Sequence, residues 1–208
     1  QGSDEWHAAR RGRVAASQMS RIITPVGRKY STQAKKYIAE ILSEMTAFGP
    51  PVNGDAYASR AMEYGTETEP EAREYYRLLT GNDVLEVGGC ESDDGRTWVS
   101  PDGMITLAGE GEATGLLELK CPYAKTHAAY LLEPETLLKD YACQCHGALM
   151  VSGLVFVHLF SYAVNFPPVM LTIYPDDFTV ALRTAVEQFL TDLDATKAIL
   201  KSKGAAFR

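Results

Sequence analysis

The sequence has no run of about 18 uncharged apolar residues, so no transmembrane helix is expected. It has only four cysteines in 208 residues and no CxxC pair, which excludes a disulfide scaffold and favours the reducing cytoplasm. Repeats, low-complexity tracts and an apolar leader are also lacking, so neither a repeat protein nor a secretory signal is expected. The 46% of hydrophobic residues excludes intrinsic disorder, and the length suits a single domain over residues 1–208.

Positive charge is scarce in most of the chain but concentrated at its start. The formal net charge is −7, which argues against indiscriminate coating of nucleic acid. Residues 1–40 hold eight Lys or Arg and three acids, giving +5, so the remainder carries −12. Such a chain can hold an anionic polymer at one place, although a solvated basic helix face explains the charge alone equally simply.

Apolar spacing and turn residues predict alternating helices and strands. The predicted helices cover residues 4–12, 34–47, 56–64, 67–79, 123–132, 135–152 and 176–201. The predicted strands cover residues 84–91, 96–100, 104–107, 115–121, 153–163 and 168–174. Ser17 is expected to cap a short helix that follows it. This order predicts one α/β core with a mixed sheet.

Two carboxylates and one ammonium are expected to meet at one edge of that sheet. Glu118 and Lys120 alternate with Leu119 on a strand, so they share a face while Leu119 enters the core. Asp102 ends a neighbouring strand, one hairpin away. Carboxylates bind Mg²⁺, and a nearby lysine can orient or deprotonate a metal-bound water, helped by cationic surroundings that lower its pKa. The alternative is that Glu118 and Lys120 form the solvent-facing half of an amphipathic strand.

Asp102 followed by Glu118-Leu119-Lys120 resembles the PD-(D/E)xK nuclease motif, and the wider sequence resembles the phage lambda exonuclease/YqaJ-type viral recombinase family. The matching blocks, in the family's order, are residues 5–12 (EWHAARRG), 16–17 (AS), 65–73 (GTETEPEAR), 100–103 (SPDG), 117–122 (LELKCP) and 141–144 (YACQ). Residues 153–208 match only in their pattern of strands and helix. The resemblance implies a restriction-endonuclease-like core, with a mixed central β-sheet flanked by helices.

The resemblance assigns catalytic roles residue by residue. It implies that Asp102 and Glu118 bind the metal, with the Leu119 backbone carbonyl as a further ligand. By the same resemblance, Lys120 corresponds to the lysine that handles the attacking water. Glu69 corresponds to the additional acid of the site; without the family it is an ordinary exposed helix glutamate.

Tyr141 and Gln144 are one helical turn apart, so they share a face. Gln144 resembles the family's site glutamine, and Tyr141 is a weaker site candidate that could equally serve helix packing.

A zinc site is not expected, because the side chains of Cys143 and Cys145 on a predicted helix point about 200° apart and cannot share one ion.

The basic segment is similar to the family's pocket for a 5′-terminal phosphate. Arg10 supplies a guanidinium fork, and Ser17 supplies a hydroxyl near a helix start, where it could equally be a plain cap. Arg11 and Arg13 are further candidate phosphate contacts. The chain departs from the family in Ala15-Ala16-Ser17, where a threonine often precedes the Ala-Ser pair.

The resemblance implies a Mg²⁺-dependent exonuclease, with Mn²⁺ as a substitute, that acts 5′ to 3′ on linear double-stranded DNA with 5′-phosphate ends. Mononucleotides and a 3′ overhang for strand annealing are the implied products. The implied assembly is a ring-shaped homotrimer, and the implied partner is a single-strand-annealing protein in the cytoplasm of a bacterial host, encoded by a phage or prophage. The alternatives are a DNA-end-binding recombination module that does not cleave and a PD-(D/E)xK endonuclease.

Overall fold

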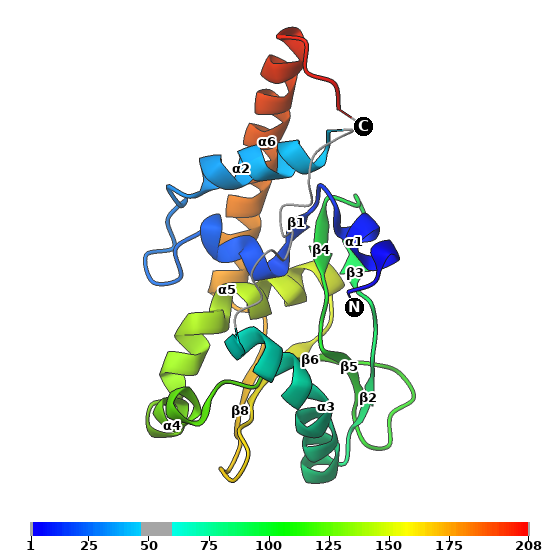
Figure 1. The fold of residues 1–208 in the computed structure, drawn as a ribbon, viewed down its shortest axis with the longest axis vertical. Coiled ribbons are helices and arrows are strands. Elements are labelled where there is room, and N and C mark those ends of the chain that lie inside the picture. Colours follow the sequence, from blue (N-terminus) through cyan, green and yellow to red (C-terminus); the bar gives the residue numbers. More distant parts are fainter. Residues whose placement is uncertain (1, 47–59, 208) are drawn as a thin grey trace.

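The computed structural model describes residues 2–46 and 60–207 (Figure 1). The elements in chain order are α1 (Asp4–Arg10), β1 (Val14–Ala15), the 3₁₀ helix η1 (Ala16–Arg21), α2 (Ala34–Glu44), α3 (Arg60–Thr80), β2 (Asp83–Leu85), β3 (Cys90–Glu91), β4 (Thr97–Val99), β5 (Gly103–Thr106), β6 (Gly115–Lys120), α4 (Ala124–Leu132), α5 (Pro134–Ser152), β7 (Phe156–Ser161), β8 (Val169–Ile173) and α6 (Asp177–Ser202). The last residue of the helix predicted over residues 34–47 and the start of the helix predicted over residues 56–64 lie outside the described residues.

The main sheet has the strand order β2-β5-β6-β7-β8, and the expected mixed α/β class is confirmed. Strand β6 pairs in parallel with β7, whereas the other pairs are antiparallel. Alternate residues of β6 enter two different apolar clusters: Leu116 packs with residues of α5, and Leu117 and Leu119 pack with residues of α3. Helices therefore cover both faces of β6. A second, small sheet has the order β1-β4-β3.

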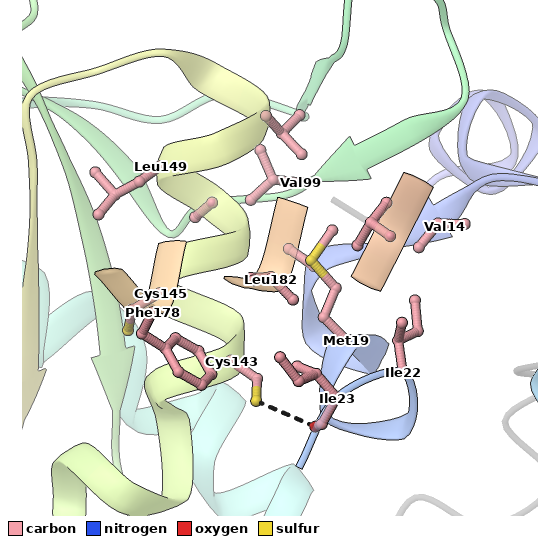
Figure 2. Packing of buried hydrophobic residues seen from close by; sticks show 14 of the residues in the cluster. Val14, Met19, Ile22, Ile23, Val99, Cys143, Cys145, Leu149, Phe178 and Leu182 are labelled. Carbon is pink, nitrogen blue, oxygen red and sulfur yellow. Dashed lines mark hydrogen bonds between the residues drawn. The ribbon is translucent and has the colours of Figure 1, made fainter. Parts of the chain in front are cut away.

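The larger apolar core joins η1 to α5 and α6 (Figure 2). Met19 and Leu182 are fully buried in it, and the Cys143 thiol lies 3.8 Å from the Ile23 carbonyl oxygen. Helix η1 approaches α5 closely at Gly147, where an added Cβ would lie only 2.4 Å from the Met19 sulfur. This close packing fixes the start of η1 relative to α5.

Two local predictions were wrong. Ser17 is not a cap: Ala15 takes that position, and Ser17 lies inside the first turn of η1. The interruption expected at Gly65-Thr66 is absent, and α3 runs without a break from Arg60 to Thr80. A glycine weakens a helix by only about 1 kcal/mol, which tertiary packing can offset; here Gly65 faces the segment that follows β6.

The predicted strand over residues 84–91 is split between the two sheets. Its first part pairs with β5 as β2, and its last part pairs with β4 as β3. Gly89 lies against the indole of Trp98, so close that an added Cβ would be 2.2 Å from a ring carbon. The glycines at residues 88–89 therefore let the chain leave one sheet and join the other.

Candidate active site

Asp102 is held beside β6 by the pairing of β5 with β6. Its backbone N–H donates to the Leu117 carbonyl oxygen at 3.0 Å, and its Oδ2 accepts the Leu119 N–H at 2.7 Å. Gly103 follows at once and has no room for a side chain, since a Cβ would lie 2.2 Å from a methyl carbon of Val84. The hairpin geometry thus places the carboxylate where the sequence predicted it.

Glu118 and Lys120 lie on one face of β6, as expected. The Lys120 ammonium donates to Glu118 Oε1 at 2.5 Å, and Gln144 Nε2 on α5 donates to the same oxygen at 2.5 Å. The Lys120 nitrogen also lies 4.6 Å from the ring centroid of Tyr141. Glu118 is only 4% exposed, which excludes the alternative of a solvent-facing strand edge.

Burial and like charge raise the pKa of two acids in this group. Burial first, and then the Glu118 carboxylate, raise the pKa of Asp102 to about 7. Burial and the Asp102 charge together raise the pKa of Glu69, on α3, to about 7. Burial lowers the pKa of Lys120, but Glu118 and Asp102 more than offset this, so its pKa is raised, opposite to the direction expected beside a cation. The repulsion between these carboxylates is one that a bound cation would relieve.

The donor set suits a hard cation. The carboxylates of Glu69, Asp102 and Glu118 and the Leu119 carbonyl offer only oxygen, the element that Mg²⁺ prefers. Within residues 2–46 and 60–207, no three His, Cys, Asp or Glu side chains converge into a ready metal cluster. Mg²⁺ keeps several waters and needs only one or two protein carboxylates, so the oxygen set fits it.

A cavity of about 250 Å³ joins these groups to the basic segment. Its lining includes the site residues Glu69, Asp102, Glu118, Lys120 and Gln144. Residues of α1, β1, η1 and β4 complete its wall, among them Arg10 and Ser17. The structure thus brings the predicted metal-binding acids and the first two predicted phosphate contacts into one cavity.

Arg10 is positioned by an indole network. The Trp6 N–H donates to the Gly88 carbonyl oxygen at 2.8 Å and to Ser100 Oγ at 3.0 Å, and the Trp98 N–H donates to Ser100 Oγ at 2.8 Å. The Arg10 guanidinium lies 5.1 Å from the Trp6 ring centroid, and among the described residues it forms no ion pair. Its fork therefore remains available to an anion.

The two remaining arginines lie elsewhere. Arg13 pairs with Glu91 at 2.7 Å, donates to the Ala9 carbonyl oxygen at 2.6 Å and lies over the Trp98 ring. Neither Arg11 nor Arg13 is among the described residues that line the 250 Å³ cavity. His146, the residue after Cys145 on α5, is engaged in the core, where its Nδ1 lies 2.8 Å from Thr179 Oγ1.

Residues 5–155 match the model of the YqaJ-like viral recombinase domain. The chain belongs to the YqaJ-like viral recombinase family. It is similar to an alkaline exonuclease from Laribacter hongkongensis (LHK-Exo), with a TM-score of 0.76, 30% identity and 97% of each chain covered. The same exonuclease in complex with dAMP gives a TM-score of 0.79, at 30% identity and 97% coverage of each chain.

A phage-related exonuclease from Haemophilus somnus 129PT shares the fold, with a TM-score of 0.69 and 14% identity over 90% of this chain and 96% of that one. No curated protein matches the chain. These comparisons confirm the expected family and the restriction-endonuclease-like fold, and they support a nuclease role in recombination. No helix within residues 2–46 and 60–207 combines the length and apolarity that a membrane span requires.

Sequence reasoning on this YqaJ-family member missed the role of Ser100 and Trp98. Both line the cavity, and Ser100 accepts hydrogen bonds from two indoles. Ser100 belongs to the family-like segment 100–103 (SPDG), next to Pro101-Asp102, and this position could have indicated that Ser100 lies beside the site. Trp98 was predicted only as part of a strand.

Proposed function

We propose that this YqaJ-family chain is a Mg²⁺-dependent exonuclease that degrades one strand of linear double-stranded DNA, 5′ to 3′, from a phosphorylated end. The observation that carries the proposal is the single cavity that contains both the Asp102, Glu118 and Lys120 group and the Arg10 and Ser17 pair. A phosphate held by Arg10 and Ser17 positions a nearby phosphodiester for hydrolysis at the carboxylates. An endonuclease has no need of such an end-binding pair.

Each side chain has a role in hydrolysis. Asp102, Glu118, Glu69 and the Leu119 carbonyl would hold Mg²⁺, or Mn²⁺ in its place, and the cation would supply activation of water and polarisation of the phosphoryl oxygens. Lys120 orients the attacking water. Water adds across the P–O bond, so one product carries a phosphate and the other a hydroxyl.

The α5 side chains support this group without reacting. Gln144 donates to the Glu118 carboxylate and so fixes its rotamer. Tyr141 presents its ring to the Lys120 ammonium, an arrangement that stabilises the charged form.

The proposal extends to the products, the assembly and the partner of the enzyme. LHK-Exo, at 30% identity over 97% of each chain, is an alkaline exonuclease solved with dAMP, and this supports release of mononucleotides. We propose that the 3′ overhang serves recombination by strand annealing, together with a single-strand-annealing protein. A homotrimer ring around the DNA, a phage or prophage gene and action in the bacterial host cytoplasm belong to this proposal.

The test is a gel assay on linear duplex DNA labelled separately at each end. Duplexes with 5′-phosphate and 5′-hydroxyl ends are compared with closed circles, in Mg²⁺ and in EDTA. We expect metal-dependent loss of mononucleotides from the 5′-phosphate strand, with circles untouched. Nicked circles would favour the endonuclease, and a shift of DNA ends without cleavage would favour the non-cleaving module.

A further inference from the structure

A pair of tyrosines lies beside the candidate active site without lining its cavity. The rings of Tyr64 on α3 and Tyr123, the residue before α4, have centroids 4.9 Å apart and planes inclined by 33°. Tyr123 follows Lys120 by three residues, and Tyr64 precedes Glu69 by five residues on α3. The pair therefore joins the two elements that carry a catalytic lysine and a site acid.

The backbone brings these elements together. An added Cβ at Gly65 would lie 3.7 Å from the Cys121 carbonyl oxygen, so α3 passes close to the chain just after β6. Because consecutive Cα atoms are 3.8 Å apart, the Tyr123 Cα lies within about 11 Å of the Lys120 Cα. This is the scale of one or two nucleotides along a single strand.

Tyr123 remains accessible to solvent. It is 47% exposed although its ring lies against that of Tyr64. An aromatic ring with one packed and one open face is a rigid surface on which a further planar group can stack. No side chain in the described residues forms a second ring contact with Tyr123.

The charges around the pair balance. Arg60 and Lys125 are exposed nearby, but Glu63 and Glu67 are exposed on the same turns of α3. Attraction of the phosphate backbone is therefore weak at this place, in contrast to the region of Arg10. Stacking on an aromatic ring contributes about 1–3 kcal/mol per base and tolerates every base, as a nuclease without sequence preference requires.

We propose that Tyr123, backed by Tyr64, is a stacking platform for a nucleobase of the DNA strand that enters the site. This inference rests on the proposed DNA substrate. The platform holds the base while Arg10 and Ser17 hold the end phosphate, so the strand is held at two places near the carboxylates. Tyr123 is a positioning residue, since it contacts a base and not the reacting phosphate.

The experiment uses a 5′-phosphorylated duplex with 2-aminopurine at successive positions near the end of either strand. Stacking quenches the fluorescence of 2-aminopurine. The fluorescence of the probe and the affinity of the protein for the duplex are measured in EDTA, and the KM and kcat of cleavage are measured in Mg²⁺. We compare Tyr123→Leu, Tyr123→Phe and Tyr123→Trp with a control, Tyr174→Leu. Tyr174 is 58% exposed and follows β8, at the end of the sheet opposite Lys120.

We expect Tyr123→Leu to weaken binding about tenfold and to lose the quenching at one position. Tyr123→Phe should retain both, Tyr123→Trp should bind more tightly, and Tyr174→Leu should match the wild type. Tighter binding cannot result from misfolding, so the Trp variant keeps the test decisive if the Leu variant unfolds. Equal affinity and quenching for all Tyr123 variants would overturn the platform. A wild type that quenches the probe without cleaving would overturn the exonuclease and leave the platform standing.

Discussion

The apolar core between η1, α5 and α6 and the candidate active site both include side chains of α5, but the two regions bury different groups. In the core, Met19 and Leu182 are fully buried, and burial lowers the pKa of His146, which favours its neutral form. In the site, the buried Glu118 forms an ion pair with the partly buried Lys120, and Asp102 lies beside them. A buried charge network contributes little to stability, whereas apolar packing contributes most of it. The core therefore supplies the rigidity that the site needs.

The site side of this comparison is tested most strongly by Lys120→Ala. A lysine that orients the attacking water contributes about 10²–10⁴-fold to the rate. We expect cleavage to fall by that factor while DNA-end binding is retained, measured by the gel assay and by anisotropy. Lys139→Ala, an exposed position on α5, should cleave like the wild type. Retained cleavage in Lys120→Ala would remove it from the mechanism.

The core side is tested by Leu182→Ala. Its side chain is fully buried, so its truncation should lower the free energy of unfolding by about 2–5 kcal/mol. Val180→Ala on the same helix is the control, because Val180 is 65% exposed and should change stability by less than about 1 kcal/mol. Urea unfolding measures both. Equal losses would show that α6 does not pack as the structure has it.

The pH dependence of stability separates the two regions. The raised pKa values of Asp102 and Glu69, about 7, mean that the folded state binds more protons than the unfolded state between about pH 4 and 7. These groups should therefore make the metal-free protein less stable as the pH rises through that window. We expect Mg²⁺ to raise the melting temperature at pH 8. The variant Asp102→Asn with Glu69→Gln should show a flatter pH profile and no Mg²⁺ effect; an unchanged profile would contradict the assignment.

Arg10→Ala tests the end-phosphate pair. A charge-assisted hydrogen bond contributes about 1.5–3 kcal/mol, so the preference for 5′-phosphate over 5′-hydroxyl ends should fall about tenfold to a hundredfold. Arg183→Ala, exposed on α6, should keep the wild-type preference. The ratio of cleavage rates on the two duplexes measures it, and an unchanged ratio in Arg10→Ala would place the phosphate elsewhere.

Local rules predicted the parts of the site that depend on one strand or one hairpin. The alternation of β6 placed Glu118 and Lys120 on one face, and the hairpin placed Asp102 beside them. Longer-range contacts escaped these rules. The helix cap expected at Ser17 depends on how η1 packs on α5, and the division of residues 84–91 depends on Gly89 lying under Trp98. The family resemblance, and not periodicity, singled out Glu69 among the glutamates of α3.

One close contact between the two regions lies at Gly147, and its substitution tests whether the core positions the site. A Cβ in Gly147→Ala would lie 2.4 Å from the Met19 sulfur and 3.3 Å from the Ala16 Cβ, and Met19 is too deeply buried to move aside freely. We expect a loss of about 1–3 kcal/mol in unfolding free energy. Because η1 carries Ser17 into the cavity, the preference for 5′-phosphate ends should weaken as well, whereas Gly111→Ala, which has open space around it, should change neither quantity. A Gly147→Ala variant that loses stability but keeps its end preference would show that the core and the site are mechanically independent.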